Sequence, residues 1–430
     1  MKYRIPKTSF LGPQIDPQQH YTVVGAGIAG LYLGYFLKKA GISFEIHEIS
    51  DQAGGLLHSH QTPFGRVEQA ANGFIWCPEI EEICRQLSLD IIGPKPSAKA
   101  RYLLRNNQLR RFPLNPLEAF KMLGKLFVSN DQPARTLEDF GFQHLGIKAT
   151  RQILEPAFAG IYGADIKDLS FPATIPALAE GLNEHDRLIG AIRHFRKKRK
   201  AQSTTKAPRG THGFADGIGQ LPEKLAVHLR EHIHFQSDGL ALDRKHRNLI
   251  LCTPAYVSAA YTDGSLKNLL NEVAYTPILS VTMHVNRADC PGFKPGFGCL
   301  IPRSEGYTCL GVLFNSSIFP NRSLSEEVLS LTAILRADDN YPDLLDRSDA
   351  EIQELIESEL QKLFRFNGDF LQFKLFRWGR GIPVYSPTLY HNLPKIDTLA
   401  KQQGINLFGN YTGQISIRGM SQTAAQLLDY

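Results

Sequence analysis

The chain has 430 residues, of which 43% are hydrophobic and 21% are charged, a composition that excludes a disordered or fibrous protein. Its net charge of +6 is modest for this length and does not by itself indicate a nucleic-acid-binding protein. A chain of this length is expected to fold into two or three domains.

Several sequence features bear on where the protein works. No run of 18 consecutive apolar residues is present, so we expect no transmembrane helix. The first twenty residues lack the apolar core of a signal peptide, so export is not expected. The six cysteines are scattered without a CxxC pair, which favours reduced, buried thiols over disulfides or a zinc site. These features predict a cytoplasmic protein without a metal site.

Residues 21–55 predict a strand, a glycine turn, a helix and a second strand that ends on an acid. Gly25 allows a tight turn, Gly27 lets backbone approach a pyrophosphate, and Gly30 lets helix and strand pack closely. Glu48 follows at about the spacing at which a carboxylate meets a ribose hydroxyl. A dinucleotide site is therefore predicted. Its candidate residues in the turn are Gly25, Ala26, Gly27, Ile28, Ala29 and Gly30.

A second glycine pair, Gly54 and Gly55, follows the acid. Two turns rich in backbone N–H groups can converge on one anion, so this pair is expected against the phosphates of the same ligand. The combination of GxGxxG with a later ExxxxxGG resembles flavoproteins of the amine-oxidase and glutathione-reductase type. The resemblance favours FAD over NAD as the cofactor.

The next segments predict a hairpin and a helical region. Residues 98–113 indicate two strands joined at Asn106 and Asn107. Residues 115–200 have a mainly helical pattern. The basic run at residues 193–200 closes one of these helices. It is interpreted either as a solvated helix end, favourable with the helix dipole, or as a contact for anionic lipid headgroups.

From residue 213 onward the pattern changes again. A glycine turn precedes a helix and a strand in LPEKLAVHLREHIHF, and a buried strand follows at residues 248–254. Residues 270–385 are rich in strands, including ILSVTMHVN, GFGCLIP and YTCLGVLFN, with a helix expected at Asp349 to Phe364. The last forty residues predict a strand, INLFGN, and a terminal helix.

Several distant segments together resemble the FAD-dependent protoporphyrinogen oxidases within the monoamine-oxidase-like flavoproteins. The likeness covers nearly the whole chain from about residue 20, and the motifs occur in the expected order. The stretch GFGCLIPRSEGYTCLGVLFNSSIFPNR is the most specific of them. The other segments are ARYLLRNNQLRRFP, FAGIYGADIKDLSF, RLIGAI, RWGRGIPVY and INLFGNYTG.

The resemblance implies a mixed fold, α/β with α+β, in which a Rossmann-like FAD-binding domain is discontinuous. Its three parts would be residues 17–90, 207–262 and 388–430. Residues 263–387 would form a substrate-binding domain with an antiparallel sheet. Residues 91–206 would contribute the substrate hairpin and a helical insertion that rests on a membrane surface.

The implied reaction is the oxidation of protoporphyrinogen IX to protoporphyrin IX in three cycles of hydride transfer to flavin N5, with dioxygen as acceptor and peroxide as product. The cofactor carries this chemistry, so no catalytic acid or base is assigned. Arg110 matches a position that meets a substrate propionate, with Arg111 as the neighbour if the hairpin register differs by one. Leu300 and Leu313 match positions that sandwich the macrocycle.

The resemblance also places the end of the chain beside FAD. Gly409, Asn410 and Tyr411 would lie next to the flavin, and Trp378 on the path back to it. Covalently flavinylated amine oxidases use a cysteine in this C-terminal segment, but no cysteine follows Cys309, so noncovalent FAD is expected. A homodimer or a haem-pathway enzyme is an expected protein partner, and nucleic acid is not.

Some residues depart from the family pattern and keep alternatives open. Gln52 replaces a common arginine, Ala70 replaces a common glycine, and the segment 235–254 is short. Coproporphyrinogen III, with four carboxylates, is an alternative substrate. An amine oxidase or another carbon-oxidising flavoenzyme is a second alternative. A noncatalytic flavin- or tetrapyrrole-binding protein is the third.

Overall fold

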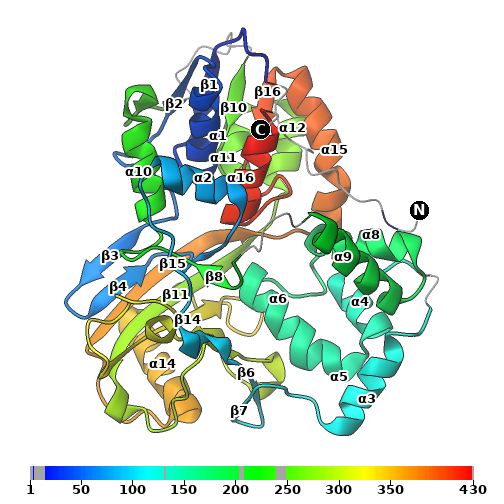
Figure 1. Cartoon of the computed structure of the whole chain (residues 1–430), viewed down its shortest axis with the longest axis vertical. Coiled ribbons are helices and arrows are strands. Elements are labelled where there is room, and N and C mark those ends of the chain that lie inside the picture. Colours follow the sequence, from blue (N-terminus) through cyan, green and yellow to red (C-terminus); the bar gives the residue numbers. More distant parts are fainter. Residues whose placement is uncertain (1–2, 4–14, 130–131, 203–207, 239–247, 429–430) are drawn as a thin grey trace.

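A five-stranded parallel sheet forms one unit of the protein (Figure 1). The computed structural model describes residues 3, 15–129, 132–202, 208–238 and 248–428, and the backbone alone for 198–202. The sheet order is β16-β10-β1-β2-β9, so strands from three separate stretches of the chain pair side by side. This confirms the discontinuous Rossmann-like unit, whereas the bounds of the domains stay a prediction. The strands are β1 (Tyr21–Val24), β2 (Phe44–His47), β9 (Ile233–His234), β10 (Leu249–Leu251) and β16 (Ile405–Leu407).

Helices cover both faces of this sheet. On one face, apolar side chains of α1 (Ile28–Lys39), α2 (Pro78–Gln86), α10 (Gln220–His228) and α16 (Ile417–Gln426) share a core with β1 and β2. On the other face, α11 (Ala255–Ser258), α12 (Gly264–Asn271) and α15 (Pro387–Gln402) pack over β1, β10 and β16. The sequence analysis did not predict α15, which contains Pro394 in its interior.

The second unit is a seven-stranded sheet in the order β15-β11-β14-β13-β12-β6-β7. Its core lies under α14 (Asp349–Phe364), a helix predicted with these bounds. The predicted hairpin is confirmed, with both asparagines of its turn at positive φ. The strands are β6 (Arg101–Arg105), β7 (Gln108–Arg110), β11 (Tyr275–Asn286), β12 (Gly298–Leu300), β13 (Cys309–Leu313), β14 (Val328–Arg336) and β15 (Gln372–Pro383).

A helical region with its own apolar core stands beside the two sheets (Figure 1), as the sequence predicted. None of the described helices has the length and apolar content required to cross a membrane. Side chains 198–200 of the basic run lie outside the described residues. The helices are α3 (Pro116–Lys125), α4 (Leu137–His144), α5 (Ile147–Ala149), a π-helical turn (Thr150–Leu154), α6 (Glu155–Tyr162), α7 (Phe171–Thr174), α8 (Pro176–Glu184) and α9 (Leu188–Gln202).

Short elements join the units. The hairpin β3 (Ser59–Thr62) and β4 (Gly65–Glu68) extends from the first unit toward the second sheet, and β5 (Phe74–Ile75) pairs with β8 (Thr211–His212). The short helix α13 (Asn315–Ile318) follows β13. These connections bring the carboxyl edge of the parallel sheet and one face of the antiparallel sheet to a common region.

Candidate active site

The turn between β1 and α1 leaves no room for side chains at two of its glycines. Gly25 has φ +100°, and a Cβ there would lie 3.0 Å from the carbonyl oxygen of Cys252. A Cβ at Gly30 would lie 2.0 Å from the carbonyl oxygen of Gly25, well inside van der Waals contact. The turn can therefore close against its own helix because Gly30 has no side chain.

Gly27 differs from these two glycines because it faces open space. A Cβ added there would meet no protein atom within 4 Å. Gly27 is the N-cap of α1, no side chain caps this helix, and no acidic residue lies in its first turn. The N-terminal N–H groups of a helix without a cap favour an anion. The neighbouring candidates Ala26, Ile28 and Ala29 are buried and contribute backbone to the same turn.

The second glycine pair packs directly against the first turn. The Gly54 N–H donates to the carbonyl oxygen of Ala26 at 2.9 Å. A Cβ at Gly55 would lie 3.2 Å from the Cα of Gly27. Both glycines have positive φ, +119° and +59°. The two motifs thus form one backbone surface, which is the arrangement expected for a shared phosphate site.

Glu48 lies just after β2, at the rim of this turn. Its Oε2 accepts from the Ala26 N–H at 2.7 Å, and its Oε1 accepts from the Ser50 N–H at 3.0 Å. The carboxylate is half-buried. These bonds hold it beside the glycine turn, and its predicted contact with a ribose stays a prediction.

The C-terminal segment reaches the same edge of the parallel sheet. The Phe408 N–H donates to the carbonyl oxygen of Leu251 at 3.0 Å, so the predicted residues Gly409 and Asn410 follow the end of β16. The side chain of Tyr411 is fully buried, and its hydroxyl bonds to Ser258 Oγ at 3.2 Å. Any contact of Tyr411 with a ligand would therefore come from its backbone.

The residues at this edge fit a dinucleotide. The parallel strands β1 and β16 each lead into a helix at their carboxyl ends, so the N-termini of α1 and α16 lie at the same edge of the sheet. α16 shares an apolar core with α1. The glycine turns and the first turn of α1 would hold the pyrophosphate, Glu48 would meet a ribose, and residues 409–411 would border the ring system.

The predicted substrate residues share one face of the antiparallel sheet. Strand register pairs Leu300 with Gly311 and with Leu103, and pairs Leu103 with Arg110. Residues opposite one another in a sheet point to the same face, and so do residues two apart in a strand. Arg110, Leu300 and Leu313 therefore share the face opposite α14. The leucines are half-buried and Arg110 is exposed.

Helix α6 covers part of this face. A Cβ at Gly160 would lie 2.9 Å from Leu300 Cδ2, and a Cβ at Gly163 would lie 2.6 Å from Ile278 Cδ1. The guanidinium of Arg336 donates to the carbonyl oxygen of Gly163 at 3.0 Å and anchors the end of the helix. Small residues in α6 thus let it approach the sheet closely beside the predicted macrocycle position.

Buried polar atoms without a hydrogen-bond partner lie on the same face. They include Ser280 Oγ, Asn315 Oδ1 and the indole N–H of Trp378. Native proteins rarely leave such atoms unsatisfied, so they indicate where water or a bound ligand belongs. Ser280 and the neighbouring Thr282 and His284 occupy alternate positions of β11, between the apolar Leu279, Val281, Met283 and Val285. This alternation was visible in the sequence and could have identified the polar face.

A buried ion pair, missed by the sequence analysis, closes the junction between the two sheets. Arg322 Nη2 lies 2.7 Å from Glu68 Oε1, and both side chains are 1% exposed. Ser59 Oγ and the Ile218 N–H also donate to this carboxylate. Burial raises the pKa of Glu68, and the positive charge of Arg322 opposes that rise. The pair joins β4 of the first unit to the loop that follows α13 in the second.

Comparison with known proteins agrees with this geometry. The model of the flavin-containing amine oxidoreductase family matches residues 28–419, and the chain belongs to this family. Protoporphyrinogen oxidase 2 of Arabidopsis thaliana is 26% identical, with 92% of this chain and 90% of the relative covered. Coproporphyrinogen III oxidase of Bacillus subtilis is 20% identical, with 86% of this chain and 88% of the relative covered.

Solved structures have the same fold. A protein from Exiguobacterium sp. 255-15, provisionally named a protoporphyrinogen oxidase, superposes with a TM-score of 0.78 at 17% identity, covering 96% of this chain and 98% of that one. Cyclohexylamine oxidase from Brevibacterium oxydans superposes with a TM-score of 0.64 at 13% identity, covering 95% and 98%. The protein is an FAD-dependent oxidoreductase.

Proposed function

We propose that this enzyme oxidises protoporphyrinogen IX to protoporphyrin IX, with dioxygen as the electron acceptor. The observation that supports it most is the shared face of Arg110, Leu300 and Leu313, which places a cation and two apolar side chains on one wall. A flat macrocycle with propionates requires that combination. The relatives named protoporphyrinogen oxidase, matched over most of their length, support the same substrate.

The proposed roles of the residues are binding and orientation. FAD, when bound, supplies the hydride acceptor and the route to dioxygen. Arg110 would pair with a propionate through a charge-assisted bond, and Leu300 and Leu313 would exclude water from the ring face. The indole N–H of Trp378 would donate to a polar group of the cofactor or the substrate, because it has no partner in the described chain.

The test is conversion of protoporphyrinogen IX by the purified holoenzyme in air, followed by porphyrin fluorescence with peroxide measured in parallel. We expect one peroxide for each two electrons removed, three for each porphyrin formed. Failure to form porphyrin, with turnover of an amine under the same conditions, would contradict the proposal and would favour the amine-oxidase alternative.

Coproporphyrinogen III is a second candidate, and one observation favours it. A surface cavity of about 290 Å³ lies beside the hairpin and is lined by three basic residues, Lys99, Arg101 and Arg111. Arg110 is on the same hairpin. A substrate with four carboxylates would use more of these cations than one with two.

The ratio of kcat/KM for the two porphyrinogens separates these candidates. If protoporphyrinogen IX is the substrate, Arg111→Ala changes its kcat/KM less than about twofold. If the cavity serves coproporphyrinogen III, Arg111→Ala lowers kcat/KM for that substrate by about tenfold or more, as expected for loss of a charged hydrogen bond. A wild-type preference for coproporphyrinogen III would assign the enzyme to it.

We also propose that the enzyme is cytoplasmic and contacts a membrane surface through α3. This helix has no buried residue. Within the helix Phe120 is 74% exposed, Leu117 62% and Leu123 51%, and Phe127, two residues after its end, is 56% exposed. Such a cluster is larger than isolated surface residues require and is typical of an interfacial helix. Lys121 and Lys125 would face anionic headgroups. α3 is a stronger candidate than residues 196–200.

Pelleting with anionic phospholipid vesicles tests this contact. Phe120→Glu is expected to reduce the bound fraction severalfold, because it places a charge in the apolar cluster. Val227→Glu is the matched control, since Val227 is 66% exposed on α10, far along the chain in the first unit. Equal binding of both variants and the wild type would exclude α3 as the contact.

A further inference from the structure

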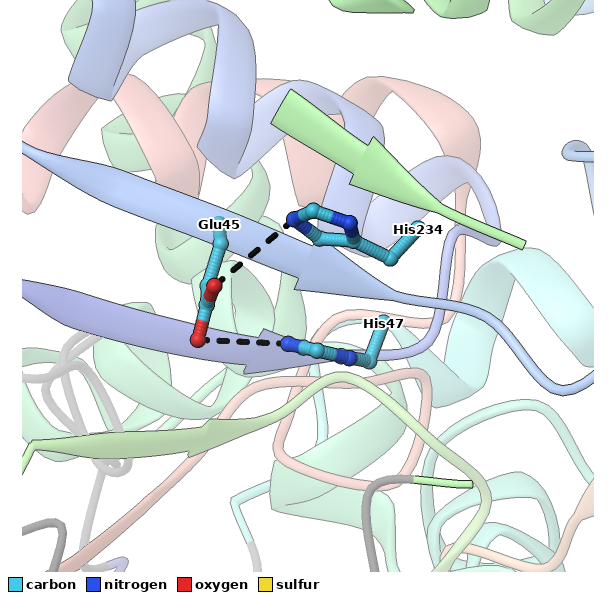
Figure 2. A group of neighbouring side chains, drawn as sticks. All are labelled: Glu45, His47 and His234. Atoms are coloured by element: carbon cyan, nitrogen blue, oxygen red, sulfur yellow. Dashed lines mark ion pairs between the residues drawn. The ribbon is translucent and has the colours of Figure 1, made fainter. Parts of the chain in front are cut away.

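A carboxylate and two imidazoles meet at the outer edge of the parallel sheet (Figure 2). Glu45 and His47 alternate along β2 and so share a face. His234 pairs with His47 in the adjacent strand β9. This face of the sheet is covered by the apolar side chains of α11, α12 and α15 at strands β1, β10 and β16. At β2 and β9 the same face carries the polar group instead.

The contacts within the group are ion pairs. His234 Nε2 lies 3.7 Å from Glu45 Oε2, beyond hydrogen-bonding range. His47 Nε2 lies 3.2 Å from Glu45 Oε1 in an ion pair, and it makes no other polar contact within the described residues (Figure 2). His47 is 7% exposed, so this nitrogen is also shielded from water. This buried ring nitrogen and the carboxylate oxygen that it faces are both of the atom types that bind a metal ion.

Neighbouring hydroxyls hold the group in this arrangement. Ser237 Oγ lies 2.7 Å from His47 Nδ1. If Nδ1 carries the proton and donates it to Ser237, Nε2 presents its lone pair to the group, as in histidines that bind metals. Thr22 Oγ1 donates to Glu45 Oε1 at 3.2 Å and fixes the carboxylate.

We propose that Glu45, His47 and His234 bind a divalent transition-metal ion of the Zn²⁺ type. Atoms about 2.0–2.1 Å from a tetrahedral Zn²⁺ lie about 3.4 Å apart. His47 Nε2 lies 3.2 Å from Glu45 Oε1 and His234 Nε2 lies 3.7 Å from Glu45 Oε2, and one ligand atom from each of the three residues lies within 4.8 Å of the others. His234 is half exposed, so water can take the fourth position. Two imidazoles and a carboxylate suit zinc better than magnesium or calcium.

The scattered cysteines predicted no metal site, because a metal site recognisable from sequence usually has closely spaced ligands. These three ligands come from two strands nearly 190 residues apart in the chain. The proposed metal ion would also lie close to the predicted cofactor residue Glu48. The Glu48 N–H donates to the carbonyl oxygen of His234 at 2.9 Å, and the Ser237 N–H donates to that of Glu48 at 3.0 Å. Metal binding would therefore hold β9 and β2 together next to Glu48.

Zinc binding by the FAD-loaded enzyme tests the proposal. Protein treated with EDTA and then dialysed is titrated with Zn²⁺ against a chromophoric chelator, and Co²⁺ replaces Zn²⁺ to report coordination by its visible absorption. We expect one Zn²⁺ per chain and a higher Tm with zinc. Glu45→Gln and His234→Ala should each weaken binding at least about tenfold. Ser237→Ala should weaken it less.

The control uses the second group of this kind, Glu184, His185 and His194, which is more exposed. In that group His194 Nδ1 lies 2.9 Å from Glu184 Oε2, within hydrogen-bonding range. His194→Ala should leave zinc binding unchanged. The Tm of the metal-free protein and its flavin content confirm that each variant folds. His234→Ala should disturb folding least, because this histidine is exposed. Failure of the wild type to bind zinc, or unchanged affinity in both Glu45→Gln and His234→Ala, would overturn the proposal.

Discussion

The cofactor edge and the substrate face are built in different ways. Backbone forms most of the cofactor edge, where Gly25 and Gly30 have no space for a side chain and Gly27 faces open space. Side chains form the substrate face, and strand register decides which of them meet. A backbone site depends on a few glycines at fixed spacing and can be identified in a sequence. A side-chain face depends on pairing between distant strands.

Replacing glycines of the first turn should have the largest effects and should separate two roles. Gly30→Ala places a Cβ 2.0 Å from the carbonyl oxygen of Gly25. We therefore expect the free energy of unfolding to fall by more than about 3 kcal/mol, and we expect the variant to lose its bound FAD. Gly27→Ala meets no protein atom and should weaken FAD binding while leaving the Tm of the FAD-free protein nearly unchanged.

Urea unfolding and flavin content measure both effects. Gly124→Ala in α3 is the control, because a Cβ there meets nothing and alanine favours a helix by up to about 1 kcal/mol over glycine. If Gly27→Ala kept full affinity for FAD, Gly27 would not border the phosphates.

Breaking the buried ion pair between the sheets should cause the next largest loss of stability. Arg322→Met leaves Glu68 buried without its cation, which typically costs about 3–5 kcal/mol. Lys401→Met, which breaks an exposed pair with Asp397, should cost less than about 1 kcal/mol. The two values come from urea unfolding of each variant. Similar small losses in both would show that Glu68 and Arg322 do not hold the junction.

A change on the substrate face should affect turnover and leave the cofactor edge intact. Arg110→Ala is expected to lower kcat/KM for the porphyrinogen by about 10- to 100-fold, the range for a lost hydrogen bond to a charged group. FAD content should not change, because Arg110 lies on the hairpin of the other sheet. Arg347→Ala, which removes a half-buried arginine just before α14, is the control. An unchanged KM would remove Arg110 from the propionate role.

Acid should lower the free energy of unfolding through His284, which lies at the junction between the sheets. This effect should be smaller than that of breaking the buried ion pair. Burial lowers the pKa of this imidazole below its ordinary 6.5, so the unfolded chain takes up the proton first. The stability it contributes is complete above about pH 6.5 and is lost as pH falls through the lower, folded pKa. His284→Gln should reduce the pH dependence of the unfolding free energy between pH 7 and 5 by at most about 1.4 kcal/mol per pH unit. His391→Gln, at an exposed position, is the control substitution.

The sequence predicted the regular elements well where local patterns specify them. The β1–α1–β2 unit, the Asn106–Asn107 hairpin and the helix ending at Phe364 were identified from spacing and turn chemistry. The helix α15 was missed because Pro394 normally ends a helix.

Tertiary features were harder to foresee. The burial of Tyr411 and the pairing of Glu68 with Arg322 depend on neighbours that are distant in sequence. The unpartnered indole of Trp378 has the same origin. The family resemblance named Arg110, Leu300 and Leu313 separately, and only the strand register places them on one face.

The flavin spectrum of the purified protein tests the central claim most directly. We predict one noncovalently bound FAD per chain, bleached by anaerobic addition of protoporphyrinogen IX and restored by air with formation of peroxide. A flavin that stays oxidised with this porphyrinogen, and is bleached instead by an amine, would contradict the account.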